Sequence, residues 1–287
     1  TLFAVMPKSH TGINNLAAET LHCPLNDLNQ IVGFAKTIKP DVAIVGPEEP
    51  LYHGVTDVLR KNKVQVFAPT REQAKIEWSK AYAMRIAEKY EIPGAPAFDV
   101  IESVKELEKL GAFSRKFGTS FVVKADGLMG GKGVFVGGDH FHNLKDARKI
   151  TRQLLERGPV VLQEKLEGVE FSGHYIAGGG VFFTCPYSQD HKRAFEGDKG
   201  PNTGGMGSYS DESHSLPFLS QKDLSQARKI AEAVFEAVKK ETGSDYTGVL
   251  YPAFMKTSAG IKWLELNCRF GDPEVVNILP ILNDDFA

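Results

Sequence analysis

The amino-acid sequence predicts an α/β fold whose second half has the mixed character of an α+β domain. Within residues 1–70, short apolar runs bounded by proline and glycine alternate with segments of helical periodicity. Farther along, apolar strands flank glycine-rich turns, and 18 of the 28 glycines fall between Gly118 and Gly207. A chain of 287 residues is long enough for two or more domains. We therefore expect a truncated doubly wound N-terminal domain and a second domain with glycine-rich loops.

The composition excludes several classes of protein. The 34 Lys and Arg residues nearly balance the 36 Asp and Glu residues, so a surface that coats nucleic acid is not expected. No apolar run approaches the roughly 18 residues of a membrane span, and no signal peptide opens the sequence. The three cysteines lack a short metal-ligand spacing, which favours a reducing, cytoplasmic setting. Because the sequence starts at Thr1 and runs directly into apolar residues, we expect it to be part of a longer polypeptide.

The first 95 residues are expected to form alternating strands and helices, followed by one longer helix. A capping box of Thr70 and Gln73 begins that helix, which contains Ser79 and Lys80 and stops near Tyr90. Proline and glycine at 93–96 then break it. The expected strands are residues 2–6, 42–45 and 64–68, and the expected shorter helices are residues 28–38 and 55–61.

The remaining residues predict a second α/β segment with several hairpins. Three glycines at 178–180 join two strands of one hairpin, and the longest helix is expected at 222–241. The expected domain limits are 1–70, a linking helical region at 71–95, a small lobe at 96–162 and a large lobe at 163–287. The other expected helices are residues 103–117 and 145–157, and the other strands are 121–125, 134–136, 160–163, 170–177, 181–184, 248–255 and 261–267.

The segment 122–134, VVKADGLMGGKGV, is a candidate phosphate-binding loop. A strand delivers Lys124, and glycines and Lys132 follow in the loop. Glycine lets successive backbone N–H groups converge on an anion, and lysines add positive charge, so the arrangement suits a polyphosphate. It matches neither of the two common glycine-rich nucleotide motifs. An ordinary flexible hairpin is the alternative.

The segment 263–274, WLELNCRFGDPE, is a candidate metal site. Alternate side chains of a strand share a face, so Glu265, Asn267 and Arg269 are expected on one side, opposite Leu264, Leu266 and Cys268. A carboxylate and an amide oxygen two residues apart can reach one hard cation such as Mg²⁺. An edge strand with one solvated face is the alternative, but the charges cluster where the strand ends, where ligands bind in α/β folds.

Two further segments carry weaker signals. Residues 190–207 contain few apolar anchors, so they either lie disordered on the surface or are ordered by a ligand. Residues 163–172 contain a strand end and a turn, where backbone groups leave the ladder and become free to pair with a planar base. Glu170 could accept hydrogen bonds from ribose hydroxyls, although glutamates at strand ends are usually just exposed.

Taken together and in this order, these segments resemble the ATP-grasp ligases, and within them the phosphoribosylamine–glycine ligases, also called glycinamide ribonucleotide synthetases. The resemblance implies a truncated Rossmann-like (pre-ATP-grasp) domain followed by a two-lobed ATP-grasp domain. The matching strings are GPEEPL at 46–51, SK at 79–80, VVKADG and GKGV within 122–134, QDHKR at 189–193, GPNTGGMG at 200–207, YTGVLY at 246–251 and ELNCRFGDPE at 265–274.

The resemblance also implies an activity, an ATP-dependent carbon–nitrogen ligation in purine biosynthesis. ATP would phosphorylate glycine to glycyl phosphate, and the amine of 5-phosphoribosylamine would then displace phosphate to give glycinamide ribonucleotide. Positioning and charge neutralisation would dominate the chemistry. Neither nucleic acid nor membrane is an implied partner, and neighbouring purine-pathway domains in a longer polypeptide are compatible with the resemblance.

The site residues follow from the family's pattern. Glu265 and Asn267 would hold Mg²⁺ or Mn²⁺, and residues 130–133 would close over the phosphates and exclude water. Residues implied at the reacting groups are Arg193, Arg269, Asp272 and Glu274. Residues implied in ATP binding are Lys80, Lys124, Gly130, Gly131, Lys132, Gly133, Gln163, Glu164, Lys165, Leu166, Glu170, Arg193 and Asn202.

The chain departs from the family's pattern in three places. Gln163 and Glu164 stand where the family usually has an acidic pair, and PKSHTG at 7–12 replaces a more glycine-rich turn. The family's first strand, its GREHA-type turn and its C-terminal domain have no counterpart in this sequence, so the chain could bind ATP without turnover. Two alternatives therefore stay open: an ATP-grasp ligase with another carboxylate substrate, and a nucleotide-binding module without catalysis.

Overall fold

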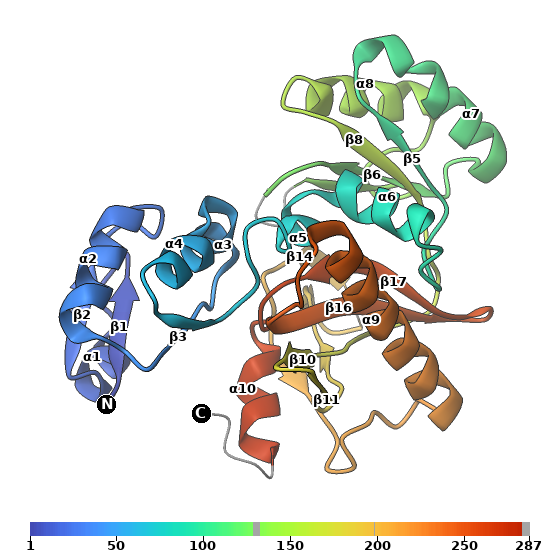
Figure 1. The fold of residues 1–287 in the computed structure, drawn as a ribbon. Coiled ribbons are helices and arrows are strands. Elements are labelled where there is room, and N and C mark those ends of the chain that lie inside the picture. The colour runs from blue at the N-terminus through green and yellow to red at the C-terminus, as the bar shows by residue number, and fades with distance from the viewer. Residues whose placement is uncertain (129–132, 198, 283–287) are drawn as a thin grey trace. The chain divides into compact units, whose positions relative to one another are not determined.

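The computed structural model describes residues 1–128, 133–197 and 199–282, whose fold is shown in Figure 1. The chain divides into two compact units, Thr1–Ala74 and Lys75–Ala287. Strands of the first unit pair in parallel, whereas those of the two larger sheets in the second unit pair antiparallel. The predicted α/β class, with a mixed second part, is therefore confirmed.

The first unit consists of β1 (Phe3–Met6), α1 (Thr11–Leu16), β2 (Glu19–His22), α2 (Leu28–Ile38), β3 (Val42–Ile44), α3 (Glu48–His53), α4 (Val55–Lys61) and β4 (Gln65–Phe67). Strand β1 pairs with β2 and β3 with β4. Helices α2 and α4 match their predicted limits. Elements α1, β2 and α3 have no predicted counterpart, because each has at most six residues and shows too little periodicity.

Two helices, α5 (Lys75–Trp78) and α6 (Lys80–Lys89), stand where one was predicted. The chain is extended at Ser79, whose hydroxyl accepts a hydrogen bond from the Tyr82 N–H at 3.2 Å and so caps α6. The predicted capping box upstream is present, since Gln73 Oε1 accepts from the Thr70 N–H at 3.0 Å and Thr70 Oγ1 from the Gln73 N–H at 3.3 Å. The expectation of one continuous helix is wrong because Ser79 begins a new one.

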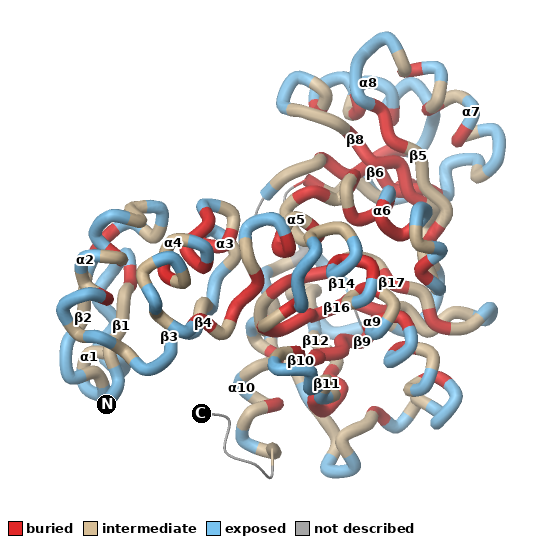
Figure 2. Tube along the Cα trace, viewed as in Figure 1, coloured by how far each residue is buried: buried red, intermediate tan, exposed pale blue. Residues whose placement is uncertain are grey.

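The first sheet of the second unit has the strand order β5–β8–β6–β7, with β5 (Phe98–Ile101), β6 (Phe121–Ala125), β7 (Val134–Val136) and β8 (Val160–Glu164). Helices η1 (Val104–Glu106), α7 (Glu108–Phe117) and α8 (Leu144–Leu155) complete this part. Leu110 and Ala147 from the helices and Phe121 and Leu162 from the sheet share one buried core (Figure 2). The predicted hairpin of β6 and β7 is confirmed.

The second sheet has the order β11–β10–β16–β17, and β9 also pairs with β16. Its strands are β9 (Val169–Ser172), β10 (Tyr175–Gly178), β11 (Val181–Thr184), β16 (Gly248–Thr257) and β17 (Gly260–Asn267). The predicted continuous strand at 170–177 is wrong, because β9 and β10 pair with different parts of β16. Between them, a Cβ on Gly173 would lie 2.9 Å from the Phe254 ring. The predicted β10–β11 hairpin is confirmed.

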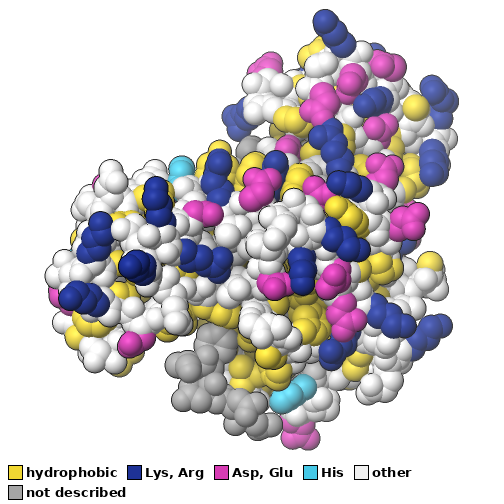
Figure 3. All heavy atoms as spheres, viewed as in Figure 1, with side chains coloured by type: hydrophobic (Ala, Val, Ile, Leu, Met, Phe, Trp, Pro, Cys, Tyr) yellow, Lys and Arg dark blue, Asp and Glu magenta, His cyan; other side chains and the backbone are white. Residues whose placement is uncertain are grey.

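Helix α9 (Gln221–Thr242) packs against β16 and β17 and extends one residue beyond its predicted limits at each end. Ser220 and Asp223 form a capping box, and Gly243 ends the helix in the left-handed conformation. Among the described residues, no helix combines the length and the hydropathy needed to cross a membrane. Acidic and basic side chains are interspersed on the face shown in Figure 3, in keeping with a net charge of −2.

Between β11 and α9, the described residues form four short strands in two separate pairs. They are β12 (Gln189–Asp190), β13 (Arg193–Phe195), β14 (Lys199–Asn202) and β15 (Ser208–Tyr209). Strand β12 pairs with β15, and β13 with β14. After β17 come α10 (Glu274–Ile278) and η2 (Leu279–Ile281). We refer to residues 189–209 as the 189–209 segment.

Candidate functional site

The C-terminal half of β17 brings the two predicted metal ligands to one place. Glu265 lies opposite Ala253 of β16, and Asn267 lies opposite Tyr251. The strict alternation predicted here is interrupted, because Leu264 is an extra residue between two paired positions and forms a β-bulge. Leu266 and Cys268 are buried as expected. The bulge leaves the Leu264 carbonyl able to accept a hydrogen bond from outside the sheet.

The side chains of Glu265 and Asn267 suit a hard cation. Asn267 Nδ2 donates to the Tyr251 carbonyl at 3.2 Å, and a hydrogen bond from Asn267 also lowers the pKa of Glu265. Both interactions use the amide as a donor, so its Oδ1 is the atom suited to a metal ion. Among the described residues, no group of three or more His, Cys, Asp or Glu side chains could hold a metal. Glu265 and Asn267 offer oxygen atoms, the ligand type that Mg²⁺ prefers, and this ion commonly keeps waters and phosphate oxygens as its other ligands.

Lysine side chains determine the ionisation of Glu265. Burial alone would raise its pKa, but the ammonium groups of Lys124, Lys192 and Lys80 outweigh this effect and bring the pKa below its ordinary value. Burial in turn lowers the pKa of Lys124 to about 8, against the opposing effect of Glu265. We call Lys80, Lys124, Glu170, Lys192 and Glu265 the charged cluster. Because its pKa is lowered, the carboxyl group of Glu265 is ionised at neutral pH.

The two lysines predicted to contact phosphates are each held by a backbone carbonyl. Lys124 Nζ, on buried β6, donates to the Leu264 carbonyl at 2.9 Å, next to Glu265. Lys80 Nζ donates to the Gly127 carbonyl at 3.4 Å. Because these carbonyl contacts use one donor of each ammonium group, further donors remain for an anion. The structure thus brings together the predicted lysines and the predicted metal ligands.

Asp126 is a site residue that sequence reasoning missed. Its Oδ2 accepts from the Ser79 hydroxyl at 3.0 Å, and its Oδ1 accepts from the Ala81 N–H at 3.1 Å. The carboxylate therefore caps α6 from the stem of the glycine-rich loop. The KADG string places Asp126 beside Lys124, but no spacing signal links it to residues more than 40 positions away.

The glycine-rich loop is described only at its two stems. Gly127 has a φ of +99°, which favours glycine, and the Gly133 carbonyl accepts from the Ala125 N–H at 2.8 Å. Gly130, Gly131 and Lys132 lie outside the described residues. Their predicted part in phosphate binding, and the predicted closure of this loop, stay predictions.

The turn predicted to contact adenine begins inside the sheet. Gln163 is buried on β8 between β5 and β6. The Glu164 N–H donates to the Ala97 carbonyl at 2.9 Å, and the Lys165 N–H donates to the Ser120 carbonyl at 3.1 Å. The expectation that the backbone leaves the ladder here is therefore wrong for these two N–H groups, because the residues just before β5 and β6 accept their hydrogen bonds.

Two side chains of this turn, those of Glu164 and Lys165, also interact with neighbouring parts of the protein. Glu164 accepts from the Ala97 N–H at 3.0 Å and forms an ion pair with Lys262. Lys165 Nζ donates to the Gly137 carbonyl at 3.0 Å. Leu166 follows the end of β8 and is partly buried. A role of the four residues Gln163, Glu164, Lys165 and Leu166 in base binding remains a prediction.

Glu170, predicted to meet ribose, forms an ion pair with Lys192. Burial alone would lower the pKa of Lys192, but Glu170 and Asp190 outweigh it and raise this pKa. Burial raises the pKa of Asp190 to about 6. Sequence reasoning did not assign Lys192 a role. The alternation along DHKR could have indicated that Lys192 and Arg193 point to different sides.

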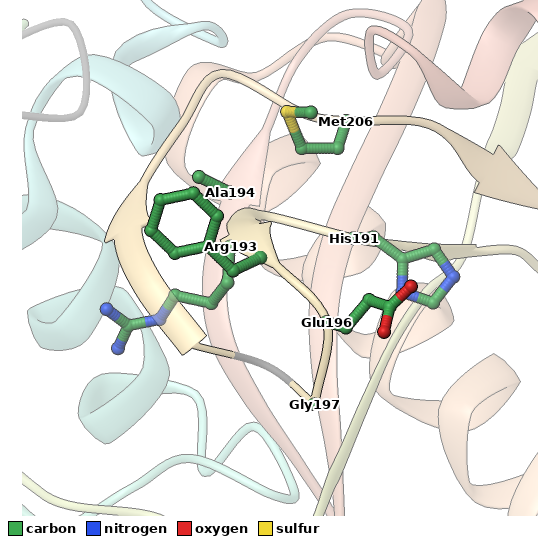
Figure 4. A pocket seen from close by; sticks show the side chains of 7 residues that line it. His191, Arg193, Ala194, Glu196, Gly197 and Met206 are labelled. Atoms are coloured by element: carbon green, nitrogen blue, oxygen red, sulfur yellow. The ribbon is translucent and has the colours of Figure 1, made fainter.

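Arg193 lies on the 189–209 segment. Its Nη1 donates to the Gly200 carbonyl at 3.0 Å, and its Nη2 lies 3.5 Å from Asp139 Oδ2. A cavity of about 280 Å³ lies beside it, and in Figure 4 the Arg193 side chain points away from those of His191 and Glu196. The side chain of Asn202, predicted in ATP binding, lies outside what the structure describes. Arg193 itself is partly exposed.

The turn after β17 carries the other predicted side chains. Arg269 Nε lies 3.1 Å from Glu77 Oε1, and Arg269 Nη1 donates to the Phe270 carbonyl at 3.1 Å. Asp272 is exposed and precedes a cis peptide bond to Pro273. Their proposed contacts with substrate stay predictions. Arg269 is thus oriented by α5, a helix almost 200 residues earlier in the chain.

Glu274 is 1% exposed and is held by the protein itself. One of its oxygens accepts from the Tyr251 hydroxyl at 2.6 Å and from the Ser172 hydroxyl at 3.1 Å. These bonds join α10 to β9 and β16. The predicted contact of Glu274 with substrate stays a prediction, and the geometry favours a part in holding the turn.

His174 also supports the turn after β17. It is fully buried between β9 and β10, and its ring stacks on that of Tyr251 at 4.4 Å. Its Nε2 accepts from the Gly271 N–H at 3.0 Å. Burial and, as the smaller cause, the charge of Arg269 lower the pKa of His174 to about 3. His174 is therefore neutral at physiological pH, which its role as an acceptor requires.

The families that match this chain also divide it in two, close to the boundary between its two compact units. Residues 2–77 match the N domain of phosphoribosylglycinamide synthetase, and residues 78–275 match its ATP-grasp (A) domain. The chain is 44% identical over 286 residues to the phosphoribosylamine–glycine ligase of Methanosarcina acetivorans and 42% identical over 291 residues to that of Methanosarcina barkeri. All of this chain is aligned in both cases, but it spans only 64% and 65% of the two relatives.

A solved structure extends the likeness to three dimensions. The crystal structure of phosphoribosylamine–glycine ligase from Thermotoga maritima superposes with a TM-score of 0.76 at 30% sequence identity. The match covers 97% of this chain and 71% of that protein. The matched domains together account for residues 2–275, so the chain belongs to the phosphoribosylglycinamide synthetase family.

Proposed function

We propose that the protein of which this chain forms a part ligates glycine to 5-phosphoribosylamine at the expense of ATP. The products would be glycinamide ribonucleotide, ADP and phosphate, formed through glycyl phosphate in purine biosynthesis. Family membership and the names of the relatives support this proposal. The observation that carries it is the charged cluster, in which the carboxylate of Glu265 lies among three lysines. The amide of Asn267 lies beside this carboxylate, and the two groups together suit a metal ion.

The first step would activate glycine. A carboxylate oxygen of glycine bonds to the γ-phosphorus of ATP, the bond from that phosphorus to the bridging oxygen breaks, and ADP leaves. Negative charge is spread over phosphate oxygens throughout, so fixed positive groups lower the barrier. Lys80 and Lys124 supply such charge from positions fixed by backbone carbonyls.

The metal would bind at the end of β17. Glu265 and Asn267 would hold Mg²⁺, or Mn²⁺ in its place, and the bound ion would neutralise phosphate charge during the transfer. The ionised state of Glu265 supports this assignment, because a protonated carboxyl would be a poor ligand. Lys192 and Glu170 would complete the charge balance around the nucleotide.

The second step would form the amide. The amine nitrogen of 5-phosphoribosylamine bonds to the carbonyl carbon of glycyl phosphate, the carbon–oxygen bond to phosphate breaks, and the nitrogen loses a proton. Arg269 lies beyond the metal ligands on the same chain segment, where it can orient a carboxylate or acyl phosphate. We also propose a cytosolic setting, supported by the three unpaired, buried cysteines.

The test uses the full-length protein and follows ADP formation. The proposal predicts that ADP forms over many turnovers only when glycine and 5-phosphoribosylamine are both present with Mg²⁺. Alanine in place of glycine is the matched control and should give no product. Equal turnover without 5-phosphoribosylamine would contradict the substrate assignment. Binding of Mg²⁺ and ATP without any turnover would instead identify a nucleotide-binding module.

A further inference from the structure

We propose that Glu77 is a positioning residue that orients the guanidinium of Arg269 for the acyl-transfer steps. The inference rests on the proposed function, because it concerns the side chain predicted to contact glycine or its acyl phosphate. Glu77 lies on α5, outside every motif that carries the family resemblance. It would not contact substrate itself.

The geometry of Glu77 is that of a two-point clamp on the end of β17. Its Oε1 lies 3.1 Å from Arg269 Nε, and its Oε2 accepts from the Cys268 N–H at 2.7 Å. One carboxylate oxygen therefore accepts a backbone hydrogen bond, and the other forms an ion pair with the guanidinium. Because the two contacts belong to adjacent residues, the clamp sets both the path of the chain and the direction of the side chain.

Burial makes the clamp effective. The side chain of Glu77 is 7% exposed and that of Arg269 is 23% exposed, so water screens their attraction poorly. Arg269 Nη1 donates to the Phe270 carbonyl at 3.1 Å, which fixes the guanidinium at a second point. A planar guanidinium held at two of its nitrogens has little rotational freedom left. Its orientation is therefore set before any substrate binds.

The element that carries Glu77 is itself held in place. Helix α5 ends at Trp78, and Ser79 then donates from its hydroxyl to Asp126 Oδ2 at 3.0 Å. Lys80, the next residue, donates to the Gly127 carbonyl. One short junction thus contacts the end of β17 through Glu77 and the stem of the glycine-rich loop through Ser79. An incorrectly placed Arg269 is the specific fault expected when Glu77 alone is altered.

The first experiment measures steady-state kinetics of full-length Glu77→Gln. Glutamine keeps the size and one acceptor but loses the charge, so the backbone contact can persist while Arg269 is released. We expect kcat/KM for glycine to fall about 10- to 100-fold, with the Kd for ATP within about twofold of wild type. Glu77→Asp, which keeps the charge, should restore part of the loss.

Glu241→Gln is the matched control. Glu241 also joins distant segments, because it forms an ion pair with Lys89 and accepts from the Tyr90 hydroxyl at 2.6 Å, at the opposite end of α6 from Lys80. Its loss should leave kcat/KM for glycine unchanged. If Glu77→Gln lowers the affinity for ATP in parallel with glycine use, or changes neither, the positioning role is refuted.

A double-mutant cycle separates action through Arg269 from any other role. In an Arg269→Ala background, Glu77→Gln should change kcat/KM for glycine by less than about twofold, because the group that it orients is gone. An undiminished effect in that background would overturn the proposal. The wild-type enzyme in the same assay reports on the proposed function independently, since absence of glycine-dependent turnover there would refute the function and not the clamp.

Discussion

The end of β17 and the 189–209 segment both bring charged side chains to the candidate site, but they hold them differently. At the end of β17, Asn267 and Glu274 are 8% and 1% exposed and are hydrogen-bonded to β16. On the 189–209 segment, the side chains of Lys192 and Arg193 are 31% and 36% exposed, and Phe195 and Met206 are 67% and 60% exposed. Burial and cross-sheet bonding make the first region the more rigid one.

Under the proposed function, this difference would correspond to two separate roles. Metal binding and acyl transfer need groups placed before the substrate arrives, because a misplaced charge stabilises a transition state poorly. The buried networks around β17 supply such placement. The exposed segment suits contacts that add affinity after the nucleotide has bound. The variants below test this division, beginning with the largest expected effect.

Removal of the carboxylate at the centre of the charged cluster should have the largest effect. Glu265→Ala deletes one of the two proposed metal ligands and removes a negative charge that acts on Lys124 and Lys192. We expect Mg²⁺-dependent turnover to fall by about 100-fold or more. Phosphate release as a function of Mg²⁺ concentration measures this. Glu236→Ala, at an exposed position of α9, is the control; an unchanged Mg²⁺ response in Glu265→Ala would refute the metal assignment.

Removal of the buried carboxylate behind the site should cost stability. Glu274→Ala leaves the hydroxyls of Tyr251 and Ser172 without their acceptor and opens a small cavity. We expect the free energy of unfolding to fall by about 3 kcal/mol, measured by urea denaturation. Glu232→Ala, which breaks a surface pair with Arg228, should cost about 0.5 kcal/mol or less. An equal loss of unfolding free energy in the two variants would contradict the greater rigidity assigned to the end of β17.

The buried imidazole should make stability depend on pH. Because the pKa of His174 is lowered from 6.5 to about 3, the unfolded chain binds more protons than the folded one in this range. His174 therefore favours folding above pH 6.5, and this contribution is lost progressively as pH falls toward 3. Between pH 6.5 and 5 the loss is about 2 kcal/mol. Urea titrations should show a smaller acid-induced loss in His174→Gln; the same loss in both proteins would contradict the assignment.

The smallest effect is expected on the exposed segment. Phe195→Ala removes a ring that is mostly in solvent and packs locally against Gly200. We expect the free energy of unfolding to change by no more than about 0.5 kcal/mol. Thermal unfolding without nucleotide measures this directly. A loss above about 1 kcal/mol would mean that the segment is anchored as firmly as β17.

Much of the fold follows from local patterns in the sequence. Helices α2 and α4 and strand β6 have their predicted limits, since periodicity and flanking breakers define them. The break at Ser79 was not predictable, because the hydrogen bond that stabilises a new helix start there comes from Asp126, 47 residues away. The separation of β9 from β10 likewise depends on pairing with β16. Long-range contacts override local preference in both cases.

In the candidate site, too, some residues could be predicted from local spacing and others depend on long-range contacts. Glu265 and Asn267 could be selected because they stand two residues apart on one strand. Lys124 and Lys132 could be selected because they lie beside or within the glycine-rich loop. Glu77 and His174 carried no such signal, because each acts on the turn after β17 from a distant element. Their importance depends on burial and on which atoms face each other. The residues proposed to meet ligands were therefore easier to select from the sequence than the residues that hold them in place.

The measurement that tests the account most directly follows oxygen atoms. The full-length enzyme is given glycine labelled with ¹⁸O in its carboxylate, together with ATP, Mg²⁺ and 5-phosphoribosylamine, and the phosphate released is analysed by mass. Because glycyl phosphate joins a glycine oxygen to phosphorus and then breaks at carbon, each phosphate should carry one ¹⁸O atom. Phosphate without the label, formed at the rate of amide synthesis, would contradict an acyl phosphate and with it the role assigned to the β17 site.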